Sequence, residues 1–354
     1  MALGSISHGS NGDFVPHLAV TVALLLVLVS LVVLIYFIHH MAKSIQLPEV
    51  IASIARDLAV AIEAEAVLYG AGQGLEAGPS VAELEHRMDE SGAVLAAPHS
   101  GYLQFVAYDT LVGMAAESDA VVRFLYRPGH FVVEGLPLAT VWPGDAAEAI
   151  GRSLQRAHFT GPNRTLAQDL TFAIDQLVEI AIRALSPALN DTFTALTCID
   201  WLSDGLCKIT ARWNPRFVQR DGLGNVRVIA AEVRYEQFVD RAFDKIRQAA
   251  KGMPAVMIRQ LDSLAKIMAY TTTDEQRAAL WDQAEMIRRS NEESVTEAGD
   301  RADVRLHYEV MEVVALEYSD GRVGTPARHE VPEPPSRWGP TRARIPRPGG
   351  RKPA

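Results

Sequence analysis

A polar stripe runs along an otherwise apolar helical segment in the middle of the chain. Asp175, Glu179 and Arg183 follow one another by four residues, and Ser186 comes three residues later. Side chains at these spacings lie on one face of a helix, where carboxylates and an arginine can pair. Exposed pairs of this kind contribute only about 0.2–0.5 kcal/mol each, so pairing alone gives the stripe a modest structural role.

The start of a new helix follows this stripe within a few residues. Pro187 ends the first segment, and Asn190, Asp191 and Thr192 are residue types that favour the first positions of a helix. Free N–H groups at such a start can bind an anion, to which Arg183 would add a fork of donors. We therefore predict a small-anion or polar-ligand site at Arg183, Ser186, Asn190, Asp191 and Thr192, supported by Asp175 and Glu179. In the alternative interpretation, Asn190 or Asp191 only caps the new helix, and Arg183 only pairs along its own.

The remaining sequence contains no pattern typical of a catalytic or cofactor site. It has no His-x-x-x-His pair, nucleophile elbow, Cys-x-x-Cys pair or Walker-type lysine. A glycine-rich stretch over 70–78 follows a helix rather than a strand, which favours a flexible connector over a phosphate loop. We therefore expect no metal, no cofactor and no catalytic residue, and we favour a protein that is not an enzyme. An enzyme with an unrecognised site around Arg183–Asp191 is the alternative.

A long apolar segment precedes these elements near the start of the chain. Leu18–Ile38 contains twenty-one residues without a charge, and a helix rising about 1.5 Å per residue then spans a hydrocarbon core of roughly 30 Å. Residues 1–17 lack Lys and Arg, and no cleavage site follows, so we expect a retained transmembrane helix at 18–40 rather than a signal peptide. Because Lys43 and Arg56 follow the segment, the positive-inside rule predicts a single pass through the cell (inner) membrane with a cytoplasmic C-terminal domain.

The charge distribution separates an acidic body from a basic tail. The chain has 34 basic and 43 acidic residues and a net charge of −9, yet residues 321–354 contain eight basic and two acidic residues. An acidic body argues against nucleic-acid binding, which needs clustered Lys and Arg. Beside a lipid bilayer the tail is suited to contact anionic lipids, each basic group contributing about 1 kcal/mol; a solubilising terminus is the alternative. Two cysteines, Cys198 and Cys207, are too few for a disulfide framework, which favours reduced thiols.

Apolar periodicity divides the rest of the chain. Apolar residues between 47 and 61 recur at steps of four and three, which predicts a juxtamembrane helix that either packs on the protein's own body or pairs subunits. Short β-branched and aromatic segments over 91–145 predict a small β-rich unit. Their spacing resembles the compact β-sandwich that carries lipoyl or biotinyl groups, which implies a β-sandwich-like unit. Helical periodicity dominates from Asp169 to about Glu317, with a hairpin expected at 216–220 and 226–233.

These patterns together predict an α+β fold that is mainly α, with a single transmembrane helix ahead of a small β-rich unit and a helical cytoplasmic domain. The Pro- and Arg-rich tail cannot bury enough apolar area to fold alone. The expected divisions are a polar N-terminus at 1–17, the transmembrane helix at 18–40, a juxtamembrane helix and flexible linker at 41–90, the β-rich unit at 91–145, the helical domain at 146–320 and the tail at 321–354.

Five segments of the chain carry a resemblance to a known family. The clearest is DLTFAIDQLVEIAIRALSPALNDTFTALTCIDWL at 169–202; the others are the apolar segment at 15–46, SGYLQF, RPGHFVVEGLPL and RDGLGNVRV. They resemble the bacterial predicted membrane proteins of domain of unknown function 2254, nearly throughout the chain up to Glu317. The resemblance implies an integral membrane protein with several amino-terminal spans and a cytoplasmic domain. This chain shows only the final span and looks shortened at its start, and the family implies no established activity.

The favoured function is a non-catalytic, membrane-anchored cytoplasmic module that binds a partner or small ligand, and we expect it to be a homo-oligomer. The chief alternative is a channel or transporter component. Thr21 and Ser30 are the only polar side chains in the segment 18–34. One such span cannot line a polar pathway by itself, so a channel would require assembly.

Overall fold

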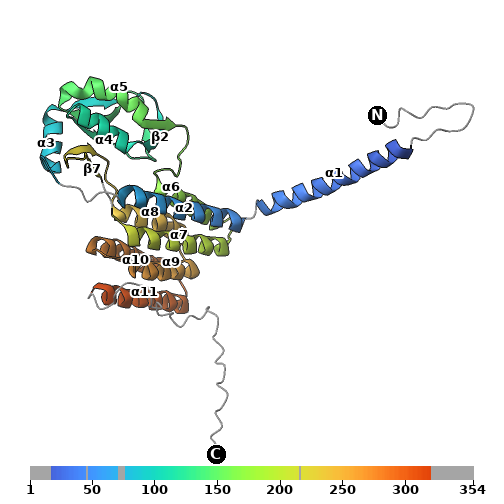
Figure 1. The fold of residues 1–354 in the computed structure, drawn as a ribbon. Coiled ribbons are helices and arrows are strands. Elements are labelled where there is room, and N and C mark those ends of the chain that lie inside the picture. Colours follow the sequence, from blue (N-terminus) through green and yellow to red (C-terminus); the bar gives the residue numbers. More distant parts are fainter. Residues whose placement is uncertain (1–16, 45–46, 71–75, 215–216, 320–354) are drawn as a thin grey trace, which may run out of the picture. The chain divides into compact units, whose positions relative to one another are not determined.

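The computed structural model describes residues 17–44, 47–70, 76–214 and 217–319 (Figure 1). The predicted polar N-terminus up to residue 16, the middle of the glycine-rich connector and the basic tail from residue 320 lie outside the described residues. Two compact units divide the chain, the first up to Ser53 and the second from Ile54 onward.

The first unit contains one strongly apolar helix, α1 (His17–Ser44). Its segment Val20–Phe37 has a mean hydropathy of 3.0, and none of that segment is buried inside the protein. A helix that is apolar on every side and has no protein around it is suited to a lipid environment. Within the described ranges it is the one helix long and apolar enough to cross a membrane, and it coincides with the span predicted at 18–40.

The helix α2 (Leu47–Gly70) carries the predicted amphipathic stripe. In the second unit, Ala55, Leu58 and Ile62 of this helix are buried. The side chain of Leu58 lies so close to Gly205 that a Cβ at residue 205 would be 2.7 Å from Leu58 Cδ2. This contact favours packing of the stripe on the protein's own body over pairing of subunits.

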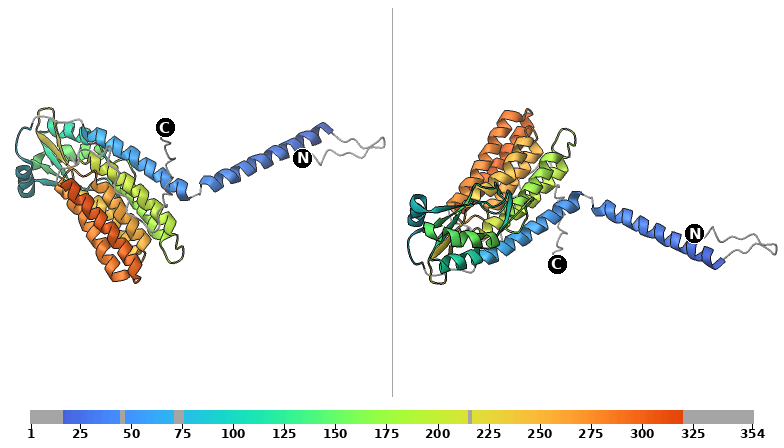
Figure 2. Two further views of the ribbon diagram at one scale, coloured as in Figure 1. Left: turned by 90° about the horizontal axis from the view of Figure 1, so that it is seen from below. Right: turned by 90° about the horizontal axis from the view of Figure 1, so that it is seen from above.

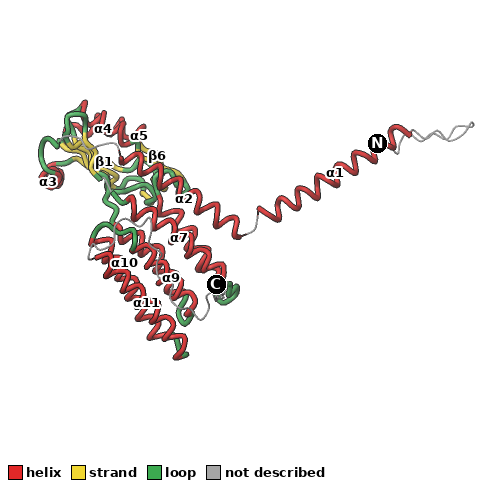
Figure 3. Tube along the Cα trace, turned by 60° about the horizontal axis from the view of Figure 1, so that its bottom comes forward, coloured by secondary structure: helices red, strands yellow, loops and turns green. Residues whose placement is uncertain are grey.

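Two small sheets form the β-rich part of the second unit and share an apolar core (Figure 3). Within the described residues, one sheet has five strands in the order β1-β5-β3-β8-β7, and the other has three in the order β4-β2-β6. The shared core contains Leu103 and Val106 from the smaller sheet and Val122 and Leu138 from the larger one. The strands are β1 (Ala93–Ala96), β2 (Gly101–Val106), β3 (Val121–Phe124), β4 (Phe131–Val132), β5 (Pro137–Trp142), β6 (His158–Gly161), β7 (Val218–Arg220) and β8 (Val226–Ile229). Short helices accompany them: α3 (Val81–Ser91), α4 (Tyr108–Glu117), the 3-10 turn Gly144–Ala146 and α5 (Ala147–Ala157).

The larger sheet joins segments that are far apart in the sequence. Strand β3 pairs in parallel with β8, so that Val122 lies opposite Val228. Strands β7 and β8 form the predicted hairpin, although its second strand ends at Ile229 rather than at residue 233. Because β6 and this hairpin complete the two sheets, the sheets include residues on both sides of the division expected after residue 145.

Helices make up most of the rest of the second unit. They are α6 (Leu170–Ala184), α7 (Thr192–Arg212), α8 (Tyr235–Ala249), α9 (Pro254–Met268), α10 (Asp274–Ser294) and α11 (Ala298–Ser319). Helix α6 packs against α7 and α8, and α9 packs against α7 and α11. Helix α10 packs against α8, α9 and α11, and the orange and red helices of Figure 2 run side by side. The described structure confirms the predicted class, α+β and mainly α.

Local sequence determines where helix α10 begins. The Thr273 hydroxyl accepts a hydrogen bond from the Gln276 N–H at 3.2 Å, and Gln276 Oε1 accepts one from the Thr273 N–H at 3.2 Å. This reciprocal capping box satisfies two N–H groups that the first turn of a helix would otherwise leave without partners. It fixes the start of a helix that is packed on three others.

Candidate functional site

The predicted anion site lies at the junction of α6 and α7. Asp175, Glu179 and Arg183 are all on α6, as their spacing predicts. Arg183 Nη2 pairs with Glu179 Oε1, and the two side chains are 70% and 63% exposed. An ion pair this exposed contributes about 0.2–0.5 kcal/mol. The contact of Arg183 therefore runs along its own helix, as the alternative interpretation supposed.

Backbone hydrogen bonds build the turn that follows α6. The Asn190 N–H donates to the Ser186 carbonyl at 2.9 Å, and the Asp191 N–H donates to the Ala184 carbonyl at 2.8 Å. Asn190 has a φ of +47°, in the left-handed region that asparagine adopts more readily than most residues. The turn brings Ser186, Asn190 and Asp191 together within one hydrogen-bonded loop.

The N-terminus of α7 already holds a carboxylate. Asp191 accepts a hydrogen bond from the Thr194 N–H at 3.1 Å and one from the Thr194 hydroxyl at 2.6 Å, and Thr192 begins the helix. These hydrogen bonds to Thr194 lower the pKa of Asp191. The Asp191 carboxylate takes the position that favours negative charge, and it repels a second anion there. The anion site remains a prediction that this geometry does not favour.

Asp175 belongs to a different group of side chains, which we call the Arg164 cluster: Arg164, Asp169, Thr171, Asp175 and Arg241. Arg164 donates to Asp169 Oδ2 at 2.6 Å and also pairs with Asp175. Arg241 Nη1 donates to Asp175 Oδ2 at 2.6 Å from α8. Thr171 accepts from Arg164 at 2.9 Å and donates to Asp169 at 2.6 Å. Only 4% of the Asp169 side chain and 18% of the Arg164 side chain are exposed.

The Arg164 cluster joins the β-rich part to the helices. Arg164 lies between β6 and α6, and Asp169 is the residue just before α6. Nearby, the Gln168 side chain makes two hydrogen bonds to the Val106 backbone of β2, at 2.8 and 3.0 Å. Sequence reasoning missed Arg164 and Arg241 because neither lies at helical spacing from Asp175. The available signal was the segment DLTFAID, which contains both aspartates and belongs to the family resemblance.

A histidine from the β-rich part borders this cluster. Gly129 has a φ of +95°, and a Cβ there would lie 2.1 Å from Asp169 Oδ2, so only glycine permits this approach. The neighbouring His130 Nε2 accepts a hydrogen bond from Arg127 Nε at 3.3 Å. Burial and then the charge of Arg127 lower the pKa of His130. The neutral form of His130 is therefore favoured at neutral pH.

The polar groups of the Arg164 cluster are engaged with one another. Its two guanidinium groups face two carboxylates, and removing one member of such a buried pair costs about 3–5 kcal/mol. The arrangement therefore stabilises a junction between elements. Burial raises the pKa of Cys198 and of Cys207 to about 12, which keeps both thiols protonated at neutral pH. Across the described residues, no group of three or more His, Cys, Asp and Glu side chains is placed to hold a metal ion.

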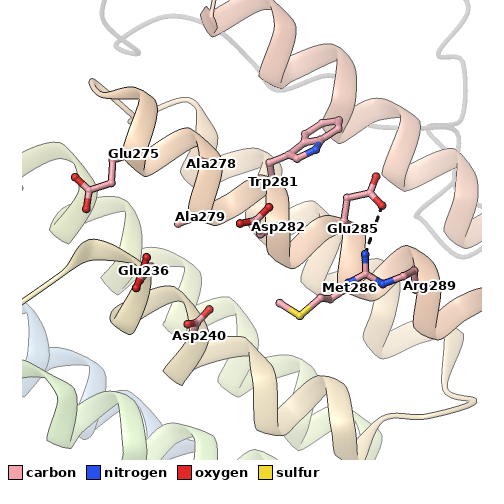
Figure 4. Close-up of a pocket in the computed structure, with 10 residues that line it drawn as sticks. All are labelled: Glu236, Asp240, Glu275, Ala278, Ala279, Trp281, Asp282, Glu285, Met286 and Arg289. Atoms are coloured by element: carbon pink, nitrogen blue, oxygen red, sulfur yellow. Dashed lines mark ion pairs between the residues drawn. The ribbon is translucent and has the colours of Figure 1, made fainter.

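A second candidate site is a groove between α8 and α10, which we call the acidic groove (Figure 4). Its volume is about 530 Å³. It is lined by Glu236 and Asp240 from α8 and by Glu275, Ala278, Ala279, Trp281, Asp282, Glu285, Met286 and Arg289 from α10. Five of these residues are acidic and one is basic, and Arg289 lies 4.0 Å from Glu285. The Trp281 ring and the Met286 side chain add apolar surface, so the groove is suited to a positively charged ligand with an apolar part.

The electrostatics of the acidic groove favour a cation with several N–H donors. Burial raises the pKa of Asp240, and the nearby charges of Asp244, Glu236 and Asp282 raise it further. The fully buried Gln283 points its amide nitrogen at Asp240 Oδ1, 2.9 Å away, while its Oε1 has no hydrogen-bond partner. A guanidinium or ammonium group would relieve the repulsion between the carboxylates.

Sequence reasoning also missed the acidic groove. Along α10, acidic residues at 275, 282 and 285 look like the solvated face of a surface helix. Along α8, Glu236 and Asp240 show the same pattern. Only the packing of α8 against α10, which joins segments about forty residues apart in sequence, turns two charged faces into one groove.

Comparison with known proteins places the chain in a class of predicted membrane proteins, which is consistent with the apolar helix α1. A family model described as "Predicted membrane protein (DUF2254)" matches residues 1–266, and the chain belongs to this family, which confirms the resemblance. The uncharacterized proteins Mb1321c of Mycobacterium bovis and Rv1290c of Mycobacterium tuberculosis are each 32% identical over 304 residues. That match covers 84% of this chain and 57% of each relative, so the chain spans little more than half their length. No solved structure matches the chain.

Proposed function

We propose that the protein is a membrane-anchored, non-catalytic module that binds a positively charged partner in its acidic groove. In this proposal α1 crosses the cell (inner) membrane once, and the folded body lies in the cytoplasm. The topology is supported by Lys43 near the end of α1, by Arg56 beyond it, and by the absence of Lys and Arg from residues 1–17.

The observation that carries the proposal is the composition of the acidic groove. Five carboxylates and one arginine line a space of about 530 Å³. Glu236 pairs with Arg234 and Glu285 pairs with Arg288, so a bound cation would rely mainly on Asp240, Glu275 and Asp282. Because the pKa of Asp240 is raised, bound positive charge would stabilise the groove. A cation placed there gains from several carboxylates at once, whereas a single exposed ion pair contributes about 0–1 kcal/mol.

Two features support a non-catalytic role, and a third weighs against a channel. The thiols of Cys198 and Cys207 have pKa values near 12 and are therefore poor nucleophiles. The members of the Arg164 cluster are engaged with one another. The apolar surface of α1 offers no polar line for an ion pathway, which weighs against a channel formed by a single chain. We extend the proposal to a homo-oligomer, which the mass of the purified protein in detergent would test.

Binding of a basic peptide tests the proposed function. The full chain, purified in mild detergent, would be titrated against a fluorescein-labelled octa-arginine peptide, with anisotropy as the readout. We expect saturable binding that weakens with added salt, because exposed charges are screened within about 8–10 Å at physiological ionic strength. The double variant Asp282→Lys with Glu275→Lys should lose most of this affinity.

A matched control separates the groove from general charge. Glu117 and Glu134 are exposed carboxylates of the β-rich part, so Glu117→Lys with Glu134→Lys changes the net charge by the same amount. Equal weakening in both double variants, or no saturable binding at all, would contradict the proposed function.

A further inference from the structure

The basic tail is a feature that the proposed function leaves unused. Residues 321–354 carry eight basic and two acidic side chains, and no acidic residue follows Glu333. Six basic residues then come within sixteen positions: Arg337, Arg342, Arg344, Arg347, Arg351 and Lys352. Five of the six are arginines, whose planar forks suit carboxylates better than lysine does.

Helix α11, which precedes the tail, runs antiparallel to α10. The Asn291 side chain of α10 donates to the Arg301 carbonyl near the start of α11 at 3.1 Å. Further along α11, the Tyr308 hydroxyl donates to Glu285, which lies earlier on α10 and lines the acidic groove. As the chain advances along α11, it therefore moves back toward the start of α10.

This direction places the end of α11 beside one end of the acidic groove. Ser319 lies eleven residues beyond Tyr308, a rise of about 16 Å in a helix. The same rise back along α10 from Glu285 reaches the first helical turn, where Glu275 lines the groove. The tail therefore leaves the described body close to the groove.

The acidic groove presents acceptors that match arginine. The carboxylates of Asp240, Glu275 and Asp282 line the groove, and the buried Gln283 side chain holds Asp240 in place through its amide nitrogen, 2.9 Å from Asp240 Oδ1. A guanidinium has five N–H donors in a rigid fork and can serve several acceptors at once. Trp281 also lines the groove, with its ring packed against Tyr308 of α11 at a centroid distance of 5.9 Å.

We propose that the Arg-rich part of the tail, residues 337–352, occupies the acidic groove of its own chain. The proposal rests on the proposed function of the groove and names its resident ligand. The groove follows α10 from Glu275 to Arg289, about 21 Å along the helix. The seventeen residues 320–336 can extend up to about 55 Å, so the tail reaches every part of the groove. A partner that binds the groove must then displace the tail.

Anionic lipid competes for the same basic residues. A lipid surface attracts each basic group by charge alone, whereas the groove adds carboxylates held at fixed positions. The tail is also covalently joined to the body that carries the groove, which gives a local concentration in the millimolar range for a short linker. These two advantages favour the groove.

Photocrosslinking of the full chain in lipid nanodiscs tests the proposal. A benzophenone maleimide attached to Ala343→Cys would report what surrounds the tail, because the raised pKa values of Cys198 and Cys207 suppress labelling of the native thiols. Mixing light and isotopically heavy protein separates links within one chain from links between copies. Nanodiscs of phosphatidylcholine, with and without phosphatidylglycerol, provide the lipid arms.

We expect the main adducts on α8 or α10 of the same chain in both lipid arms. The double variant Asp282→Lys with Glu275→Lys should lower their yield about tenfold, because each reversal replaces an attraction with a repulsion of similar size. The matched control, Glu117→Lys with Glu134→Lys, should leave the yield unchanged. Adducts mainly on lipid, adducts on a second copy, or equal yields in the two double variants would overturn the proposal.

The octa-arginine titration separates failure of this proposal from failure of the proposed function. Replacing Arg342, Arg344 and Arg347 by serine should raise the affinity of the groove for the added peptide, because the resident competitor is weakened. If the peptide binds equally to the native chain and to this triple variant, the tail does not occupy the groove, although the groove still binds cations. If neither protein binds the peptide, the proposed function itself is wrong.

Discussion

Replacing Arg164 with alanine should destabilise the folded body more than any exposed charge substitution on α6. The Arg164 guanidinium makes four hydrogen bonds, two to Asp169, one to Asp175 and one to Thr171. Without it, the Asp169 side chain, which is only 4% exposed, loses its ion pair with Arg164, while Asp175 still pairs with Arg241. Breaking a buried ion pair costs about 3–5 kcal/mol, and we expect about 3 kcal/mol because Asp175 remains paired and partly exposed.

Thermal unfolding in mild detergent, followed by intrinsic tryptophan fluorescence, measures this loss. For a body of this size 1 kcal/mol corresponds to a shift of about 2–4 °C, so Arg164→Ala should lower Tm by about 6–12 °C. Arg183→Ala, on α6, is the matched control, because the Arg183–Glu179 pair is exposed, and it should shift Tm by no more than about 2 °C. Should Arg164→Ala fail to fold, Arg164→Lys should give an intermediate decrease, because it keeps the charge but loses the fork. Equal small shifts at Arg164 and Arg183 would refute the reasoning.

Three further predictions follow from backbone geometry and from pKa values. Gly129→Ala should destabilise the body by about 1–3 kcal/mol or more, because residue 129 has a positive φ and a Cβ there would clash with the Asp169 carboxylate. Gly113→Ala, at a position in α4 where a Cβ would meet nothing within 4 Å, should stabilise the body by about 0.5–1 kcal/mol. Urea titrations would compare the two variants, and equal effects would contradict the close approach of Gly129 to Asp169. Cys198 and Cys207, with pKa values near 12, should react with Ellman's reagent at pH 7.5 more than about 10³-fold more slowly in the native protein than in urea; rapid native labelling would exclude buried thiols. The pKa of His130 is lowered in the folded state, so the unfolded chain binds more protons, and stability should fall as the pH drops through 6.5, the ordinary pKa of histidine. The variant His130→Asn should therefore show a smaller difference in Tm between pH 7 and pH 5.5. An unchanged difference would assign that pH dependence to other groups.

Elements determined by local pattern were predictable from the sequence. The apolar run at 18–38 is long enough to be a spanning helix whatever surrounds it, and α1 covers it. The capping box of Thr273 and Gln276 and the helix start at Asp191 depend on residues three apart, and both are present. In each case the interacting groups lie within one helical turn, so no knowledge of the tertiary fold was needed.

Elements determined by distant contacts were not predictable in the same way. The parallel pairing of β3 with β8 brings together residues about a hundred positions apart, and a short strand carries no signal for its partner. Helical spacing predicts that Asp175 and Arg183 belong to one site, yet tertiary contacts pair Asp175 with Arg164 and Arg241. Helical spacing shows that two side chains share a face, but it does not show what packs against that face.

The most direct test of the account is the side of the membrane on which the body lies. Alkaline phosphatase and green fluorescent protein would each be fused after Ala354 of the full chain in a bacterial host. Phosphatase is active only outside the cytoplasm, so the account predicts an inactive phosphatase fusion and a fluorescent protein fusion that remains in the membrane fraction after alkaline carbonate washing. An active phosphatase fusion, or a fluorescent fusion released by carbonate, would contradict a membrane-anchored cytoplasmic binding module.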